Sequence, residues 1–168
     1  MHPKCPEMTS SSHTVNDLNK IPVVARSVFR ETVCCFDESD SVSVEPALPA
    51  VRVAYASAQA SHGADDVARL KCQVDFQNSQ MWIDDLRVAS TWRFHGIGRQ
   101  LAAAAERIAW ALGLQTVNVF PLMSAGCFWR KMGYTSHPRT ARVVTKNLPE
   151  HGPAVPDGCE KTRKPTLS

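Results

Sequence analysis

The sequence predicts a mixed α+β domain. Two strand-like runs, 67–76 and 81–89, are followed by a glycine turn and a long alanine-rich helical run, 99–112. Apolar residues that alternate with polar ones are typical of a half-buried strand, whereas an apolar stripe at helical spacing is typical of a packed helix. A chain of 168 residues with 43% hydrophobic residues is long enough for one ordinary domain with its own core.

The N-terminal part is expected to contribute one helix. Residues 1–20 are polar and rich in Ser, Thr and Asn, so we expect a disordered segment. A helix is predicted from Pro22 to Phe36, because proline suits the first helical position and the apolar residues fall near one face. The folded domain is therefore expected to begin at residue 21.

Further strands are expected on both sides of the central runs. Strand patterns occur at 42–44, 51–58, 114–120 and 140–147. Gly113 follows the central helical run, where a left-handed cap is expected. From Pro149 onward the chain is Pro-rich and polar, which predicts a disordered tail over 149–168 and a domain over 21–148.

Composition argues against several classes of protein. The net charge of +3 is mild and gives no clear nucleic-acid signal. No apolar run approaches the roughly 20 residues that span a bilayer, and the N-terminus lacks the apolar segment of a secretory signal, so no membrane association is expected. The six cysteines include no Cys-x-x-Cys motif, so we expect no metal and a reducing, cytoplasmic compartment.

The stretch Arg93-Phe-His-Gly-Ile-Gly98 is the strongest candidate for a ligand site. It opens the central helical run, and the first N–H groups of a helix have no helical partner and attract anions. Its two glycines allow a phosphate to approach the backbone closely. Arg93, His95 and Arg99 add positive charge at the same place. A pyrophosphate ligand is the natural inference.

Two familiar phosphate-binding loops do not fit this stretch. A P-loop needs Gly, four residues and then Gly-Lys-Ser/Thr, and the chain contains no such string. A dinucleotide fingerprint needs Gly or Ala three residues after Gly98, where the chain has Leu101. It also needs an acidic residue at the end of the next strand, and 114–120 contains none.

The remaining pattern, Arg-x-x-Gly-x-Gly on a strand-to-helix turn, resembles the acyl-CoA loop of the GNAT (Gcn5-related N-acetyltransferase) superfamily. Two flanking segments, Asp84-Asp85-Leu86-Arg87-Val88 and 125–134, resemble the family at the expected spacing, so the similarity covers about residues 67–147. It implies an α+β (α/β three-layer) fold. The expected features are a mixed, mostly antiparallel central sheet, a splayed strand pair and flanking helices.

The resemblance also implies an activity and a set of site residues. The co-substrate would be acetyl-CoA, and the acceptor a primary amine of a small molecule or protein. The residues that would bind acetyl-CoA are Leu86, Val88, Arg93, Phe94, His95, Gly96, Ile97, Gly98, Arg99 and Trp129. In the family, pantetheine lies between the splayed strands, and the backbone N–H near Val88 faces the thioester oxygen.

Asp84 and Asp85 are the candidate catalytic residues. A carboxylate can deprotonate the acceptor amine through a water molecule, or attract a cationic amine. Alternation along a strand predicts that they lie on opposite faces, so that at most one lines the acceptor cleft. The alternative interpretation is that either aspartate is a hydrogen-bonded residue of the sheet.

The short helix departs from the family's pattern. Trp129 stands where the family has its proton-donating Tyr, and an indole is far too weak an acid for that role. Solvent, Cys127 or His137 would then protonate the thiolate, or the site would bind acyl-CoA without turnover. A catalytically degenerate acyl-CoA-binding or interaction module is therefore the alternative to an enzyme. The chain length permits a homodimer, and the sequence specifies neither the acceptor nor the oligomeric state.

Overall fold

The computed structural model describes residues 15–34, 36–47, 50–56 and 67–153 of the chain. In this part, seven strands form one sheet, accompanied by three α-helices and two short 3-10 helices. The elements in chain order are α1 (Val15–Thr32), β1 (Ser41–Ala47), β2 (Ala50–Ala56), β3 (Ala68–Asp75), β4 (Gln80–Val88), η1 (Ser90–Trp92), α2 (Ile97–Ala111), β5 (Thr116–Val119), η2 (Met123–Ala125), α3 (Gly126–Lys131), β6 (Thr135–His137) and β7 (Thr140–Asn147).

The sheet has the order β1-β2-β3-β4-β5-β7-β6. All neighbouring strands are antiparallel except β4 and β5, which are parallel. A parallel neighbour needs a crossover connection, and α2 makes that crossover. The predicted mixed, mostly antiparallel sheet with flanking helices is therefore confirmed.

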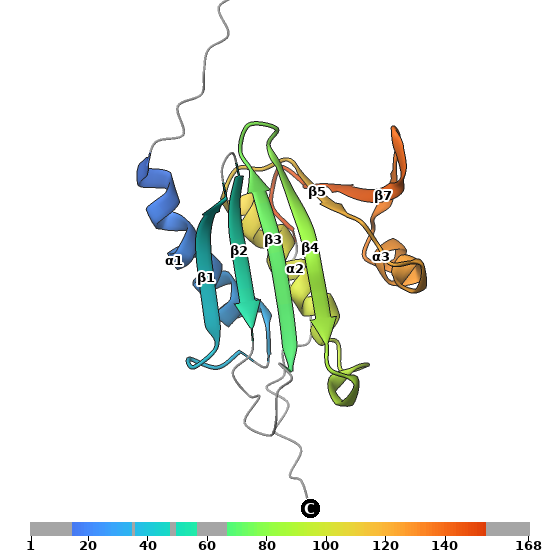
Figure 1. Ribbon diagram of the computed structural model, residues 1–168, viewed down its shortest axis with the longest axis horizontal. Helices are drawn as coiled ribbons and strands as arrows, with labels where there is room; N and C mark the ends of the chain where they lie inside the picture. The colour runs from blue at the N-terminus through green and yellow to red at the C-terminus, as the bar shows by residue number, and fades with distance from the viewer. Residues whose placement is uncertain (1–14, 35, 48–49, 57–66, 154–168) are drawn as a thin grey trace, which may run out of the picture.

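The core lies between one face of the sheet and the two long helices, α1 and α2 (Figure 1). On α1, the Phe29 ring stacks on Tyr55 of β2 with ring centroids 4.6 Å apart. On α2, Leu101 and Ile108 are fully buried, and the alanines between them allow the helix to approach the sheet closely. The opposite face of β2 and β3 carries exposed Arg52 and Lys71, so no third layer covers these strands in the described residues.

The first helix begins earlier than predicted. α1 starts at Val15 and contains Pro22 in its interior, so the prediction that residues 1–20 are disordered is wrong for 15–20; residues 1–14 lie outside the described part. An interior proline costs a helical hydrogen bond. Pro22 points to solvent, while its neighbours Ile21 and Ala25 are fully buried. Packing of this apolar stripe outweighs the local preference for ending the helix at proline.

The C-terminal boundary also lies further along the chain than predicted. Residues 149–153 pack against the end of α2, so the predicted tail does not begin at Pro149; residues 154–168 lie outside the described part. The indole Nε1 of Trp110 donates a hydrogen bond to the Glu150 carbonyl oxygen at 3.4 Å. Gly152 lies so close to the Trp110 ring that a Cβ there would be 3.0 Å from it. Glycine is therefore favoured at 152, where φ is 83° and a Cβ would press on the Trp110 ring.

The remaining elements follow the sequence pattern closely. The final strand covers the predicted range 140–147, and Gly113 ends α2 with a left-handed φ of 74° as expected. The Leu114 N–H then donates to the Ala109 carbonyl at 2.9 Å, which closes the helix end. Strand β6 was not predicted, because three residues are too few to show an alternating pattern.

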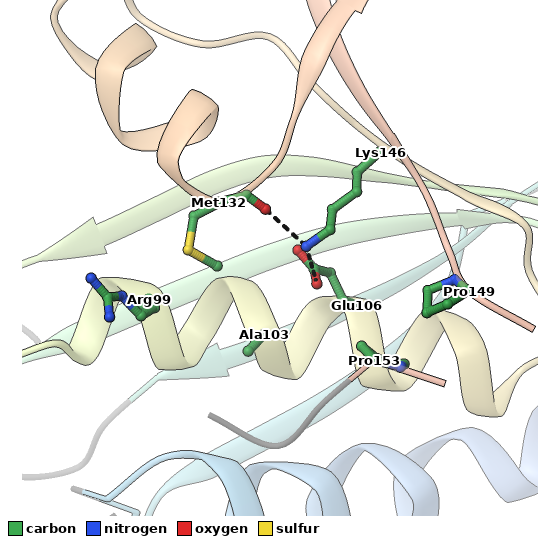
Figure 2. A pocket seen from close by; sticks show the side chains of 7 residues that line it. All are labelled: Arg99, Ala103, Glu106, Met132, Lys146, Pro149 and Pro153. Carbon is green, nitrogen blue, oxygen red and sulfur yellow. Dashed lines mark hydrogen bonds and ion pairs between the residues drawn. The ribbon is translucent and has the colours of Figure 1, made fainter. Parts of the chain in front are cut away.

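A buried ion pair joins α2 to β7. Figure 2 shows Lys146 of β7 reaching Glu106 of α2. The Lys146 Nζ lies 2.8 Å from a Glu106 carboxylate oxygen and donates a second hydrogen bond, also of 2.8 Å, to the Met132 carbonyl. The Glu106 side chain is 3% exposed, whereas the Lys146 side chain is 25% exposed. Glu106 therefore needs the charge of Lys146 to compensate its burial, whereas the ammonium group of Lys146 can also be solvated by water.

This asymmetry predicts the cost of breaking the pair. We expect Lys146→Met to lower the free energy of unfolding by about 3 kcal/mol, because a buried carboxylate is left without its cation. Glu106→Gln is the matched control and should cost less, because Lys146 can still reach water. The double variant should recover much of the loss. Urea unfolding of the three variants measures these differences, and a double variant less stable than Lys146→Met would contradict the account.

Candidate functional site

Strands β4 and β5 separate part of the way along the sheet. Their pairing ends at Ile83 and Val119; β5 stops there, whereas β4 continues to Val88. Figure 1 shows the two strands diverging beyond this point. We call the opening between them the fork. The predicted splayed strand pair is therefore confirmed, and one edge of residues 84–88 is not paired with a described strand.

A β-bulge lies on β4 where the fork begins. Ile83 and Asp85 pair with consecutive residues of β3, so Asp84 is an extra residue in the strand. Ile83 faces the core, and the next core-facing residue is Leu86, three positions later. Asp84 and Asp85 therefore both lie on the face away from the helices. The prediction that alternation separates them is wrong, because the bulge shifts the alternation by one residue.

The two aspartates have different surroundings on that face. Asp85 forms an ion pair with Arg69, with 2.7 Å between a carboxylate oxygen and Nε, and both side chains are half-buried. Asp84 makes no hydrogen bond or ion pair with the described residues. Burial raises the pKa of Asp84 above its usual value, and the positive charges of Arg52 and Lys71 oppose this increase. Asp84 is consequently the better candidate base, and Asp85 fits the structural interpretation.

The predicted anion-binding loop has the backbone of a tight turn. Phe94 and Gly96 both have left-handed φ angles, of 68° and 81°. Glycine adopts this conformation without strain, whereas Phe94 is an uncommon residue for it and is fully exposed. Gly98 lies where the fork meets α3: a Cβ added there would be 3.8 Å from Leu86, Val88 and Phe128. The loop therefore borders the fork directly.

The N-terminus of α2 is free to bind an anion. Gln100 is the first residue whose N–H donates to a helical acceptor, the Gly96 carbonyl at 3.0 Å. The N–H groups of Ile97, Gly98 and Arg99 precede it, and no side chain caps this helix end. The first turn also has no acidic residue. These donors fit a pyrophosphate group, as the sequence predicts.

The basic residues of the loop are exposed and partly engaged. The Arg93 Nε donates to the Val88 carbonyl oxygen at 3.2 Å, which ties the loop to β4. The His95 Nδ1 lies 2.9 Å from the Arg93 carbonyl, so this nitrogen carries the proton when it donates there. Arg99 is exposed in the first turn of α2. All three side chains belong to the loop and the first turn of α2, which border the fork.

The backbone of β4 points polar groups into the fork. The Ala89 N–H donates to the Val67 carbonyl of the neighbouring chain segment at 2.9 Å. Because hydrogen-bonded and non-bonded pairs alternate along an antiparallel ladder, the N–H and C=O groups of Val88 and Leu86 point away from β3. The Arg93 bond to the Val88 oxygen agrees with this direction. An acyl carbonyl in the fork would find a backbone donor there.

The aromatic side chains of α3 divide between the fork and the core. Phe128 is half-buried and lies beside Gly98. Trp129 is 4% exposed and packs edge-to-face on Phe128 and Tyr134, with ring centroids 4.9 and 5.0 Å apart. Its assignment as an acetyl-CoA contact stays a prediction, and Phe128 is the aromatic residue that borders the fork.

Tyr134 and the two alternative proton donors for the thiolate, Cys127 and His137, have different surroundings. Burial, and then the negative charge of Glu106, raises the pKa of Tyr134 well above its usual value, so this hydroxyl keeps its proton in the core. The exposed Cys127 thiol accepts a hydrogen bond from Arg130 at 3.2 Å, and His137 Nδ1 accepts one from the Arg139 N–H at 3.2 Å.

A pocket along α2 and an aromatic stack at the fork were not predicted from the sequence. A pocket of about 310 Å³ lies along α2 behind the loop (Figure 2), lined by Arg99, Ala103, Glu106, Met132, Lys146, Pro149 and Pro153. At the fork, the rings of Trp82 and Phe120 stack with centroids 5.1 Å apart and 18° between their planes. The stack depends on the pairing of β4 with β5, which the sequence pattern does not specify.

The described residues lack a metal-binding cluster and a membrane-spanning helix. In the described residues, no three His, Cys, Asp or Glu side chains are grouped so as to hold a metal ion. Among the described helices, none has the length and apolarity to cross a membrane.

The comparisons with known proteins agree with this geometry. The profile of the acetyltransferase (GNAT) family matches residues 52–134, a range that contains the fork and the loop. No curated protein sequence matches the chain.

Solved structures with TM-scores above 0.5 show the same fold at low sequence identity. Gcn5 of Tetrahymena matches with a TM-score of 0.51 and 9% identity, over 85% of this chain and 94% of that chain. An archaeal Elp3, from Methanocaldococcus infernus, matches with a TM-score of 0.52 and 21% identity. The latter match covers 66% of this chain but only 30% of the Elp3 chain. An aminoglycoside 6′-N-acetyltransferase complexed with coenzyme A matches with a TM-score of 0.45 and 14% identity, over 57% of this chain and 72% of that chain.

The family profile, the mixed sheet with its fork and the glycine loop at the start of α2 thus lead to one conclusion. The chain contains an acetyltransferase domain of the GNAT family.

Proposed function

We propose that this domain transfers an acetyl group from acetyl-CoA to a primary amine of a small molecule or protein. The observation that carries the proposal is the position of the free N-terminus of α2 at the mouth of the fork. A pyrophosphate bound by the N–H groups of Ile97, Gly98 and Arg99 would leave the fork open for the pantetheine arm, which carries the acyl group. We propose a reducing, cytoplasmic location, as the cysteine pattern predicts.

Residues of β4 would hold and polarise the acyl group. Bound acetyl-CoA supplies an acetyl group activated as a thioester. The Val88 N–H points into the fork, where it would donate to the carbonyl oxygen as negative charge develops on it. Leu86 and Phe128 would line the apolar part of the fork on either side of Gly98.

Asp84 would remove the proton from the acceptor ammonium. Its carboxylate lies on the face away from the helices, at the start of the fork, and has no ion-pair partner among the described residues. A carboxylate whose pKa is raised by burial is a stronger base than an ordinary one. Because Trp129 and Tyr134 are buried, we propose that solvent in the open fork protonates the departing thiolate.

One observation favours a second candidate function. The aromatic position of α3 that would supply an acid is a buried indole packed between two other rings. A domain that binds acyl-CoA without turnover would also have this arrangement. Free thiol measured during incubation with acetyl-CoA and an amine panel separates the two: thiol release supports the enzyme, whereas CoA binding without release for any amine supports the binding module.

The loop predicts a specific effect on CoA affinity. Gly98→Glu should weaken CoA binding about 100-fold, since a carboxylate beside the pyrophosphate opposes it by about 2–3 kcal/mol. Gly98→Ala adds a Cβ without a charge and makes only ordinary contacts of 3.8 Å with the protein, so it separates the effect of the carboxylate from that of any side chain at this position. Titration calorimetry with CoA measures both variants. Equal affinity of the Glu variant and the natural chain would contradict the assignment of the loop.

Asp84→Asn should lower kcat/KM about 100-fold at neutral pH, because a general base is lost. The ratio of wild-type to variant kcat/KM should fall towards one as the pH drops through the pKa of Asp84, since protonation makes the natural residue resemble Asn. Burial raises this pKa in the folded state, so the ionised carboxylate costs stability above that pKa and the cost disappears below the unfolded value. The variant should therefore unfold at the same or a higher temperature at neutral pH.

Asp85→Asn is the matched control for this experiment. It removes the partner of Arg69 and should reduce stability by no more than about 1 kcal/mol, because the pair is half-exposed. Its kcat/KM should change much less than that of Asp84→Asn. The reverse order, with Asp85→Asn the slower enzyme, would remove Asp84 from the mechanism.

A further inference from the structure

An exposed apolar segment follows β5 at the fork. Phe120, Leu122 and Met123 are 62%, 78% and 103% exposed, although they lie within four consecutive residues. Single exposed apolar side chains are ordinary, whereas a contiguous group of them marks a binding surface. The stack with Trp82 holds the Phe120 ring in place, so that part of this surface is ordered. We call Trp82 and Phe120 the aromatic pair.

The strand register places the aromatic pair beside Asp84. Val119 and Ile83 are the last paired residues of β5 and β4, so Phe120 and Asp84 are the next residue on each strand. Trp82 lies between two buried, core-facing residues of β4 and therefore faces away from the helices. Phe120 stacks on it and lies on the same face. A ring surface and a carboxylate thus flank the start of the fork on one face of the sheet.

The charges around Asp84 limit the kind of cation that fits there. Arg52 of β2 and Lys71 of β3 both act on this carboxylate, while Arg69 is already paired with Asp85. A ligand with several positive charges would meet repulsion from Arg52 and Lys71. A ligand with one ammonium group would interact with Asp84 and extend the rest of its body towards the aromatic pair.

We propose that the acceptor is a small amine with a single ammonium group attached to a flat apolar ring. The ammonium would lie at Asp84 and the ring on the exposed side of Phe120, since offset or edge-to-face ring contacts add to the burial of apolar surface. The aromatic pair is then the specificity-determining element of the acceptor face. This inference rests on the proposed function, whose acceptor class it narrows.

Binding of three probe amines to the full chain saturated with CoA tests the inference. The probes are 2-phenylethylamine, ethylamine with the same ammonium but no ring, and spermidine with several charges. We expect 2-phenylethylamine to bind about tenfold more tightly than ethylamine, which is the contribution of one well-placed ring, and spermidine to bind no better than ethylamine. Titration calorimetry or ligand-detected NMR gives the three Kd values.

A variant then assigns the preference to the aromatic pair. Phe120→Ala should weaken 2-phenylethylamine binding about tenfold and leave ethylamine binding unchanged. The side chain is 62% exposed, so the variant is expected to keep its fold, and thermal unfolding checks this. Val23→Ala is the control: Val23 is 72% exposed on α1 and should leave all three affinities unchanged.

The outcomes separate this inference from the proposed function. Equal binding of 2-phenylethylamine and ethylamine, tightest binding of spermidine, no measurable amine binding, or an unchanged ring preference in Phe120→Ala each overturns the inference, even if thiol release shows acetyl transfer to some amine. Ring-selective binding that Phe120→Ala removes supports it. If ring-selective binding occurs without thiol release, the proposed amine-binding role of the aromatic pair is supported and the proposed acetyl transfer is contradicted.

Discussion

The early end of the pairing between β4 and β5 is the constraint on which the site depends. A strand inside a sheet normally has hydrogen-bonding partners on both edges, and buried polar groups without partners are costly. In this protein, β5 ends after four paired residues while β4 continues to Val88. The Arg93 side chain donates a hydrogen bond to the Val88 carbonyl oxygen, and the rest of this unpaired edge of β4 borders the fork. The glycine loop and Phe128 border the same opening, so the proposed binding of the acyl donor depends on this one mismatch in strand length.

The fork also connects two faces of the sheet with different chemistry. On the helical face, the N-terminus of α2 supplies backbone donors and exposed cations suited to phosphates. On the other face, the bulge presents Asp84 and Asp85 together, next to the stacked rings of Trp82 and Phe120. An acyl donor entering from the first face and an amine approaching from the second would meet at the start of the fork. The proposed function would then proceed by direct transfer between the two bound substrates.

The sequence predicted the parts of this arrangement that depend on local pattern. Alternation located β3, strand-like runs located β4 and β7, and the glycine spacing located the loop and, to within two residues, the start of α2. The bulge at Asp84 was not predictable, because it is a property of the register between β3 and β4 and leaves no mark on the alternation of a single strand. The start of α1 at Val15 was missed for a related reason: it is decided by packing against segments distant in sequence.

Residue-resolved hydrogen exchange with and without CoA tests the central claim most directly. The account predicts that CoA slows exchange at the N–H groups of Leu86 and Val88 in the fork and of Ile97, Gly98 and Arg99 at the start of α2. Amides in β1 and β2 should keep their rates, because these strands lie away from the fork. Protection confined to the pocket along α2, or unchanged exchange at all five amides in the presence of bound CoA, would contradict the account.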